Sequence, residues 1–103
     1  MLVIPADKLP NFAASIAGHK GAKAVKAALV VWFAEVSRAT WSRMVDVKSR
    51  YATASVINSE RVVFNIKGND YRLVVAMDFE KQIALVRWIG THAEYDKIDV
   101  AKV

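Results

Sequence analysis

The side chains in this sequence that could carry chemistry lie between residues 65 and 95. They are an amide, three cations, an imidazole and a phenol: Asn65, Lys67, Arg72, Arg87, His92 and Tyr95. Cations bind anionic groups, and an imidazole can accept or donate a proton near neutral pH. These residue types could therefore bind an anion and transfer a proton, provided that the fold brings them onto one surface.

Residues 61 to 96 are expected to form two hairpins and a capped helical turn, which would position these side chains. Large apolar residues recur at every second position from 62 to 66, and the run stops at Gly68-Asn69, a pair that favours a two-residue turn with a positive φ at the glycine. The cross-strand pairs predicted by such a turn are Lys67 with Asp70, Asn65 with Arg72, and Phe64 with Leu73. Asn65, Lys67 and Arg72 would then share one face.

A second turn is predicted within residues 79–81, and its length decides which face of the next strand is which. A loop with an even number of residues places Arg87 on the face of Arg72, and Val86 and Trp88 on the opposite face, whereas an odd number reverses this. With an even loop, the apolar residues that join the polar ones on the shared face are Val63, Val74, Ala76, Ile83, Leu85 and Ile89. Such a mixed face is expected to be partly covered, by the last helix or by a partner.

Arg72 and Arg87 also have a purely structural interpretation. The carboxylates with which they could form structural ion pairs are those of Asp70, Asp78, Glu94 and Asp96. The alternative is that both arginines remain available to an anionic ligand.

His92 is predicted to open a short helix. Thr91 is followed three residues later by Glu94, which is the spacing of a capping box, so Thr91 is the expected N-cap and Tyr95 lies on the same side as His92. The positive end of a helix dipole favours a neutral imidazole, whereas a bound phosphate favours the charged form. A histidine between these states could act as an acid or a base, and the alternative is an ordinary surface histidine. The other histidine, His19, lies in a glycine-flanked turn and is expected to be exposed.

Composition limits the class of protein. A chain of 103 residues is long enough for one domain with a hydrophobic core, spanning residues 1–103, and too short for two. It contains no cysteine, which excludes disulfides and thiolate metal sites and fits a reducing cytosol. Residues 1–4 are too short for the apolar region of a signal peptide, and no apolar run approaches the roughly 20 residues of a membrane span. We therefore expect a cytoplasmic protein that makes no membrane contact.

The formal net charge of +5 is unevenly distributed. Residues 1–53 carry eight basic and three acidic side chains, whereas residues 54–103 carry seven of each. The excess lies on the predicted helices, so charge alone gives no argument for RNA contact on the strand half. The basic helices could contact ribosomal RNA or could simply face solvent.

The remaining elements predict helices first and strands afterwards. The expected elements are a strand at 2–4, a helix at 6–18, a helix containing 25–36, a helix from Ser42 as N-cap to Arg50, and a strand at 54–57. The stripe of the second helix that should face the core consists of Val25, Leu29, Trp32 and Val36. This order argues for an α+β fold, in which N-terminal helices pack on a mainly antiparallel sheet of four to five strands and a short helix follows.

Other kinds of site are not indicated. The glycines form no phosphate-binding loop, and two distant histidines with scattered acids lack the spacing of metal ligands. We expect neither a metal nor a cofactor.

Two stretches of the sequence resemble a known family. VVFNIKGNDYRLVV followed by RWIGTHAEYDKID is similar to the HigB family of type II toxin-antitoxin systems, whose members are RelE-like mRNA interferases. The resemblance implies a RelE-like fold, an endoribonuclease that cleaves mRNA at the ribosome, and neutralisation by a helix-turn-helix, HigA-like antitoxin. Carried over residue by residue, it implies catalytic roles for His92, Lys67, Arg72 and Arg87, and RNA-binding roles for Asn65 and Tyr95.

The reaction that the resemblance implies needs no metal. The ribose 2′-hydroxyl attacks the adjacent phosphate, which requires a base, an acid for the leaving oxygen, and positive charge at the phosphorane. His92 would perform one proton transfer and Lys67 would assist with the other, while which of them is the acid stays open. Arg72 and Arg87 would bind the phosphate, and Tyr95 would stack on a base or donate a hydrogen bond. The alternatives are a non-catalytic RNA- or ribosome-binding module and a domain whose mixed face serves only the antitoxin.

Overall fold

Helices and strands fall into two groups along the chain in the computed structural model, which describes residues 1–103. The elements in order are β1 (Leu2–Ile4), α1 (Lys8–Ser15), α2 (Ala22–Arg38), α3 (Met44–Arg50), β2 (Ser55–Val56), β3 (Arg61–Ile66), β4 (Tyr71–Asp78), β5 (Ile83–Thr91) and α4 (His92–Tyr95). The predicted α+β class is confirmed, and α1 and β2 are shorter than the sequence predicts.

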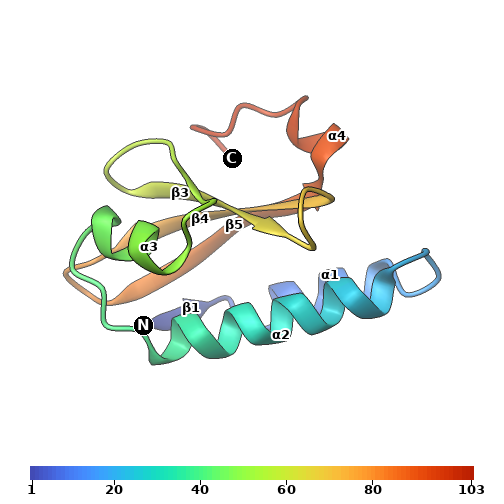
Figure 1. Cartoon of the computed structure of the whole chain (residues 1–103), viewed down its shortest axis with the longest axis horizontal. Coiled ribbons are helices and arrows are strands. Elements are labelled where there is room, and N and C mark those ends of the chain that lie inside the picture. Colours follow the sequence, from blue (N-terminus) through green and yellow to red (C-terminus); the bar gives the residue numbers. More distant parts are fainter.

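The five strands form one mixed sheet in the order β1-β5-β4-β3-β2. β1 pairs with β5 in parallel, and every other neighbouring pair is antiparallel. Helices α1 and α2 lie on one side of the sheet, and α4 with the C-terminal segment lies on the other (Figure 1). The predicted sheet of four to five mainly antiparallel strands is confirmed, and its two faces have different surroundings.

The main core lies between the sheet and α2. The residues of the predicted stripe are all buried: Val25, Leu29, Trp32 and Val36. The Trp32 ring packs edge-on against Phe64 of β3, with ring centroids 5.4 Å apart and planes 70° apart. Helix α2 spans 17 residues, and no helix of the protein is both long and apolar enough to cross a bilayer.

Helix α3 begins one residue later than the sequence predicts. Its N-cap is Arg43, and the expected N-cap Ser42 lies outside the helix. The reason is Asp46, whose Oδ2 accepts hydrogen bonds from the backbone N–H of Ser42 at 2.9 Å and of Arg43 at 3.3 Å. A carboxylate in the first turn therefore caps the free N–H groups that a serine side chain would otherwise satisfy.

The hairpin between β3 and β4 has the predicted register. Asn65 lies opposite Arg72 and Phe64 opposite Leu73, and Gly68 has a φ of 63°. Lys67 also has a positive φ, 53°, because strand pairing ends at Ile66 and Lys67 already belongs to the turn. Strand pairing thus places Asn65 and Arg72 on one face, and Lys67 stands at the end of that face.

The hairpin between β4 and β5 contains a bulge that the sequence does not predict. Its loop is the four residues 79–82, an even number, and Val86 lies opposite Val75 as expected. The register then shifts by one residue, so that Trp88 lies opposite Val74 and Arg87 is the extra residue.

This bulge corrects the predicted faces of two residues. Trp88 was expected on the core face, yet its partner Val74 belongs to the face of Arg72. Ile89 was expected on the face of Arg72, yet it lies opposite Leu73 and packs against the main core. Simple alternation fails here because one unpaired residue in a strand reverses the faces of all residues after it.

Candidate functional site

The face of the sheet opposite α1 and α2 carries the polar candidates and is covered by the chain itself. Val63 and Val74 on this face are 2% and 0% exposed, although they lie outside the main core cluster. Helix α4 and the segment after it lie over β4 and β5 on this side (Figure 1). The expected cover by the last helix is confirmed.

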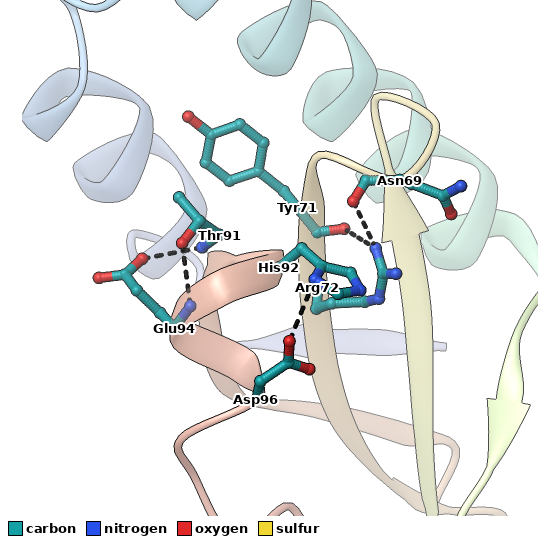
Figure 2. Close-up of polar contacts among 7 residues, drawn as sticks. All are labelled: Asn69, Tyr71, Arg72, Thr91, His92, Glu94 and Asp96. Atoms are coloured by element: carbon teal, nitrogen blue, oxygen red, sulfur yellow. Dashed lines mark hydrogen bonds and ion pairs between the residues drawn. The ribbon is translucent and has the colours of Figure 1, made fainter.

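Arg72 is held on this face by neutral groups. Its Nη1 donates to the carbonyl oxygen of Asn69 at 2.8 Å and to that of Tyr71 at 3.2 Å (Figure 2). No carboxylate forms an ion pair with it, so the structural ion pair considered from the sequence is absent. Carbonyl oxygens orient a guanidinium without neutralising it, and the remaining N–H groups of Arg72 can bind an anion.

His92 stands beside the end of the β4 strand where Arg72 lies. Gly90 lies opposite Arg72, and the backbone N–H of His92 donates to the carbonyl oxygen of Asp70 at 3.0 Å. The imidazole Nδ1 lies 3.3 Å from Oδ2 of Asp96, and both side chains are about half exposed (Figure 2). A carboxylate at Nδ1 favours the proton on that nitrogen, which leaves Nε2 of the neutral ring with a free lone pair.

The capping box that orients His92 has the predicted form. The side-chain oxygen of Thr91 accepts from the backbone N–H of Glu94 at 3.1 Å, and Glu94 Oε1 accepts from the backbone N–H of Thr91 at 2.8 Å (Figure 2). Hydrogen bonds from the backbone and the side chain of Thr91 lower the pKa of Glu94. Thr91 is the N-cap and His92 the first helical residue, as expected.

Arg87 is directed toward the C-terminal segment. Its Nε donates to the carbonyl oxygen of Val103 at 3.1 Å, and Nη1 of Arg61 donates to the same oxygen at 2.6 Å. Arg61 also donates to the carbonyl oxygen of Val100 at 3.1 Å. Arg87 forms no ion pair either, so the predicted alternative is wrong for both arginines.

Tyr95 packs on the bulge. Its ring centroid lies 6.2 Å from that of Trp88, with the ring planes 51° apart. Gly90 makes room for this pair, because a Cβ at that position would lie 2.6 Å from the Trp88 ring. The bulge that turns Trp88 onto this face thus gives Tyr95 its support.

Lys67 and Asn65 make their contacts at other places. Lys67 Nζ lies 3.2 Å from Oδ2 of Asp70, and it also lies against Gly21, where an added Cβ would be 2.5 Å from it. Asn65 Nδ2 donates to the carbonyl oxygen of Thr53 at 3.5 Å. Both residues border a hollow beside α2, on the helix side of β3.

The structure therefore brings Arg72 and His92 to one end of the sheet, whereas Arg87 and Lys67 make their polar contacts elsewhere. Sequence reasoning missed the pairing of Asp96 with His92, although the spacing of four residues in a predicted helical turn was a signal for it. It also passed over Arg61, which by alternation shares the face of Asn65. No group of three or more histidine, aspartate or glutamate side chains lies close enough to hold a metal ion.

Comparison with known proteins identifies the family. A family described as HigB_toxin, the RelE-like toxic component of a toxin-antitoxin system, matches residues 25–98, which include α2, α3, the strands β2–β5 and α4. No curated protein matches this chain. The family match covers well over half of the chain, and the α+β architecture with its five-stranded mixed sheet is consistent with a RelE-like fold. The chain belongs to the HigB toxin family of toxin-antitoxin systems.

Proposed function

We propose that this toxin is an endoribonuclease that cleaves mRNA on the ribosome by attack of a ribose 2′-hydroxyl, without a metal ion. The observation that carries the proposal is the placement of Arg72, which has no carboxylate partner, beside the His92–Asp96 pair. A positive charge next to an imidazole is the minimum that phosphodiester cleavage of this type requires. Membership of a RelE-like toxin family makes RNA the expected substrate.

The proposed reaction is an in-line displacement at phosphorus. The 2′-oxygen forms a bond to phosphorus while its proton passes to a base, and the bond from phosphorus to the 5′-oxygen breaks while an acid protonates that oxygen. The products are a 2′,3′-cyclic phosphate and a 5′-hydroxyl. Negative charge grows on the two non-bridging oxygens in the transition state, which is where a guanidinium contributes most.

His92 and Arg72 have the clearest roles in this reaction. His92 performs one proton transfer through Nε2, because Asp96 occupies the Nδ1 side of the ring. Arg72 binds the phosphate through the N–H groups that do not contact Asn69 and Tyr71. The half-exposed position of His92 gives an RNA strand access to the imidazole.

The other four candidates extend the site around this pair. Lys67 assists the second proton transfer from the hairpin tip, where its ammonium now pairs with Asp70. Arg87 binds the phosphate once RNA replaces its contact with the carbonyl oxygen of Val103. Asn65 binds RNA at the β3 edge, and Tyr95 stacks on a base from its place on Trp88.

A toxin of this family has an antitoxin partner, and we propose that this partner is a helix-turn-helix protein of the HigA type. Messenger RNA and ribosomes would be the remaining partners, which places the activity in the cytoplasm. The basic helical half, residues 1–53, would favour approach to ribosomal RNA through its net charge of +5.

The test is cleavage of mRNA in programmed ribosomes, read by primer extension. We expect His92→Ala and Arg72→Ala each to lower cleavage by about 10²-fold or more while both proteins remain folded. The matched controls are His19→Ala in the α1–α2 turn and Arg38→Ala at the exposed end of α2, which should cleave like the wild type. Near-wild-type cleavage by both site variants would refute the proposed site, and a wild-type protein that leaves no new 5′ ends would refute the activity and favour a binding module.

A further inference from the structure

A hollow of about 350 Å³ lies at the edge of β3, on the helix side of the sheet. The residues that line it are Ala27, Ala28, Val31, Trp32 and Glu35 of α2, Tyr51, and Asn65, Ile66 and Lys67 at the end of β3. Its volume lies near the lower end of the roughly 300–1,000 Å³ typical of small-molecule sites, so one small group would fill it. Short side chains from α2 form one wall, and polar groups stand on the others.

Two buried polar atoms in the lining of this hollow have no hydrogen-bond partner. They are the indole Nε1 of Trp32, whose residue is 2% exposed, and the hydroxyl oxygen of Tyr51. A buried donor without a partner is costly, and proteins usually supply one. Both rings are fixed against Phe64, so neither polar atom can easily turn away.

The hollow offers more donors than acceptors. Trp32 Nε1 can only donate, and burial raises the pKa of Tyr51, which keeps its hydroxyl protonated and able to donate. Lys67 adds an ammonium at one end. The carboxylate of Glu35 is already paired with Arg50. A complementary ligand therefore carries hydrogen-bond acceptors on an otherwise flat, apolar body and a negative charge at one end.

We propose that the hollow binds one nucleotide of single-stranded RNA, with a carbonyl oxygen of the base accepting from Trp32 Nε1 and the adjoining phosphate lying against Lys67. Guanine, uracil and cytosine carry such a carbonyl oxygen and adenine does not, so the hollow favours the first three. This inference rests on the proposed function, because an RNA strand is what the toxin would bring to this surface. The nucleotide lies on the opposite side of β3 from Arg72, so the strand passes around the sheet edge at Asn65.

The test uses the three indole N–H signals of the ¹⁵N-labelled wild-type protein, which arise from Trp32, Trp41 and Trp88. The Trp32→Phe variant assigns the signal of Trp32. We expect the monophosphates of guanosine, uridine and cytidine to move the Trp32 signal, adenosine monophosphate to move it less, and ribose 5-phosphate and inorganic phosphate to leave it in place. The signals of Trp41 and Trp88 should show no matching change at these concentrations.

A second measurement compares two tyrosines. Tyr51→Phe removes one donor from the hollow and should weaken nucleotide binding roughly three- to tenfold, as expected for one hydrogen bond. Tyr71→Phe, whose ring packs against Phe12 away from the hollow, should leave binding unchanged. Equal affinity of the Tyr51→Phe protein and the wild type would contradict the proposed lining.

Other outcomes would overturn the inference while leaving the proposed function intact. A Trp32 signal that ignores every nucleotide, in a preparation that cleaves mRNA on ribosomes, would show that the hollow is not a nucleotide site. A response to inorganic phosphate alone would reduce it to an anion site at Lys67. A response only to the antitoxin would make the hollow a protein-docking surface. Nucleotide binding without any cleavage would retain this inference and refute the proposed activity.

Discussion

At the level of single residues, His92 and Arg72 differ from the other candidates in what holds them. His92 is paired with a carboxylate one helical turn away, and Arg72 is oriented by two carbonyl oxygens that leave its charge intact. Alternation along β3 and β4 was sufficient to place Asn65 opposite Arg72, because strand pairing follows from a short turn. The partners of these side chains were not predictable, since a carbonyl oxygen is present at every position of a sequence.

The two arginines of β4 and β5 should contribute unequally to cleavage. Arg72→Gln removes the charge beside His92 and should lower cleavage by about 10²-fold or more. Arg87→Gln removes a side chain that contacts Val103 and should cost about tenfold or less. Measuring single-turnover cleavage of one mRNA in programmed ribosomes compares them directly. A larger loss in Arg87→Gln than in Arg72→Gln would move the centre of the site to the bulge.

Asp96 should act as a positioning residue for His92. Asp96→Asn removes the negative charge at Nδ1 and should lower cleavage about tenfold, whereas Asp99→Asn, which loses only an exposed pair with Lys102, should have no effect. The structural role is checked separately by the indole and amide spectrum, which should stay unchanged in Asp96→Asn. If Asp96→Asn cleaves at the wild-type rate over pH 5 to 9, the pair has no role in the reaction.

At the level of elements, two short features of β5 and α4 decide where the candidate side chains point. The capping box was readable from sequence because threonine and glutamate at this spacing satisfy each other's N–H groups locally. The bulge at Arg87 was not readable, because an extra residue in a strand leaves no local signal in an apolar run. It moved Trp88 onto the site face and Ile89 into the core.

The capping box should contribute stability in a pH-dependent way. Glu94 has a lowered pKa in the folded protein, so its contribution is fully present above the ordinary glutamate value of 4.5 and is lost as the pH falls through the lowered pKa. Thr91→Ala should therefore destabilise the protein by about 1 kcal/mol at pH 7, and by less once the pH is below the lowered value. Urea unfolding at both pH values measures this difference. An equal effect of the substitution at the two pH values would show that Glu94 does not serve the cap.

The space beside Gly90 should be essential to the bulge. Gly90→Ala places a Cβ 2.6 Å from the Trp88 ring and should destabilise the protein by about 1–3 kcal/mol through overpacking. The matched control is Gly18→Ala, which meets no atom within 4 Å. Thermal unfolding measures both, with Trp88 fluorescence as a local report. A Gly90→Ala protein as stable as the control would mean that Trp88 and Tyr95 can rearrange freely.

At the level of the whole molecule, the two sides of the sheet separate stability from the proposed chemistry. The helix side holds the main core, which the stripe on α2 predicted because its residues recur at helical spacing. The other side is closed by the chain's own C-terminal segment through Arg61 and Arg87. Contacts between residues some 16 to 42 positions apart could not be predicted without the register of β5 and the path of the last residues.

The central claim is that the toxin cleaves RNA through the 2′-hydroxyl, and the ends of the product test it most directly. Fragments of a defined mRNA, cut in programmed ribosomes by the wild-type protein, can be identified by mass spectrometry. We predict a 2′,3′-cyclic phosphate on the upstream fragment and a 5′-hydroxyl on the downstream one, and no cut where the scissile nucleotide is a 2′-deoxy analogue. A 3′-hydroxyl with a 5′-phosphate, or cleavage of the 2′-deoxy substrate, would contradict the account.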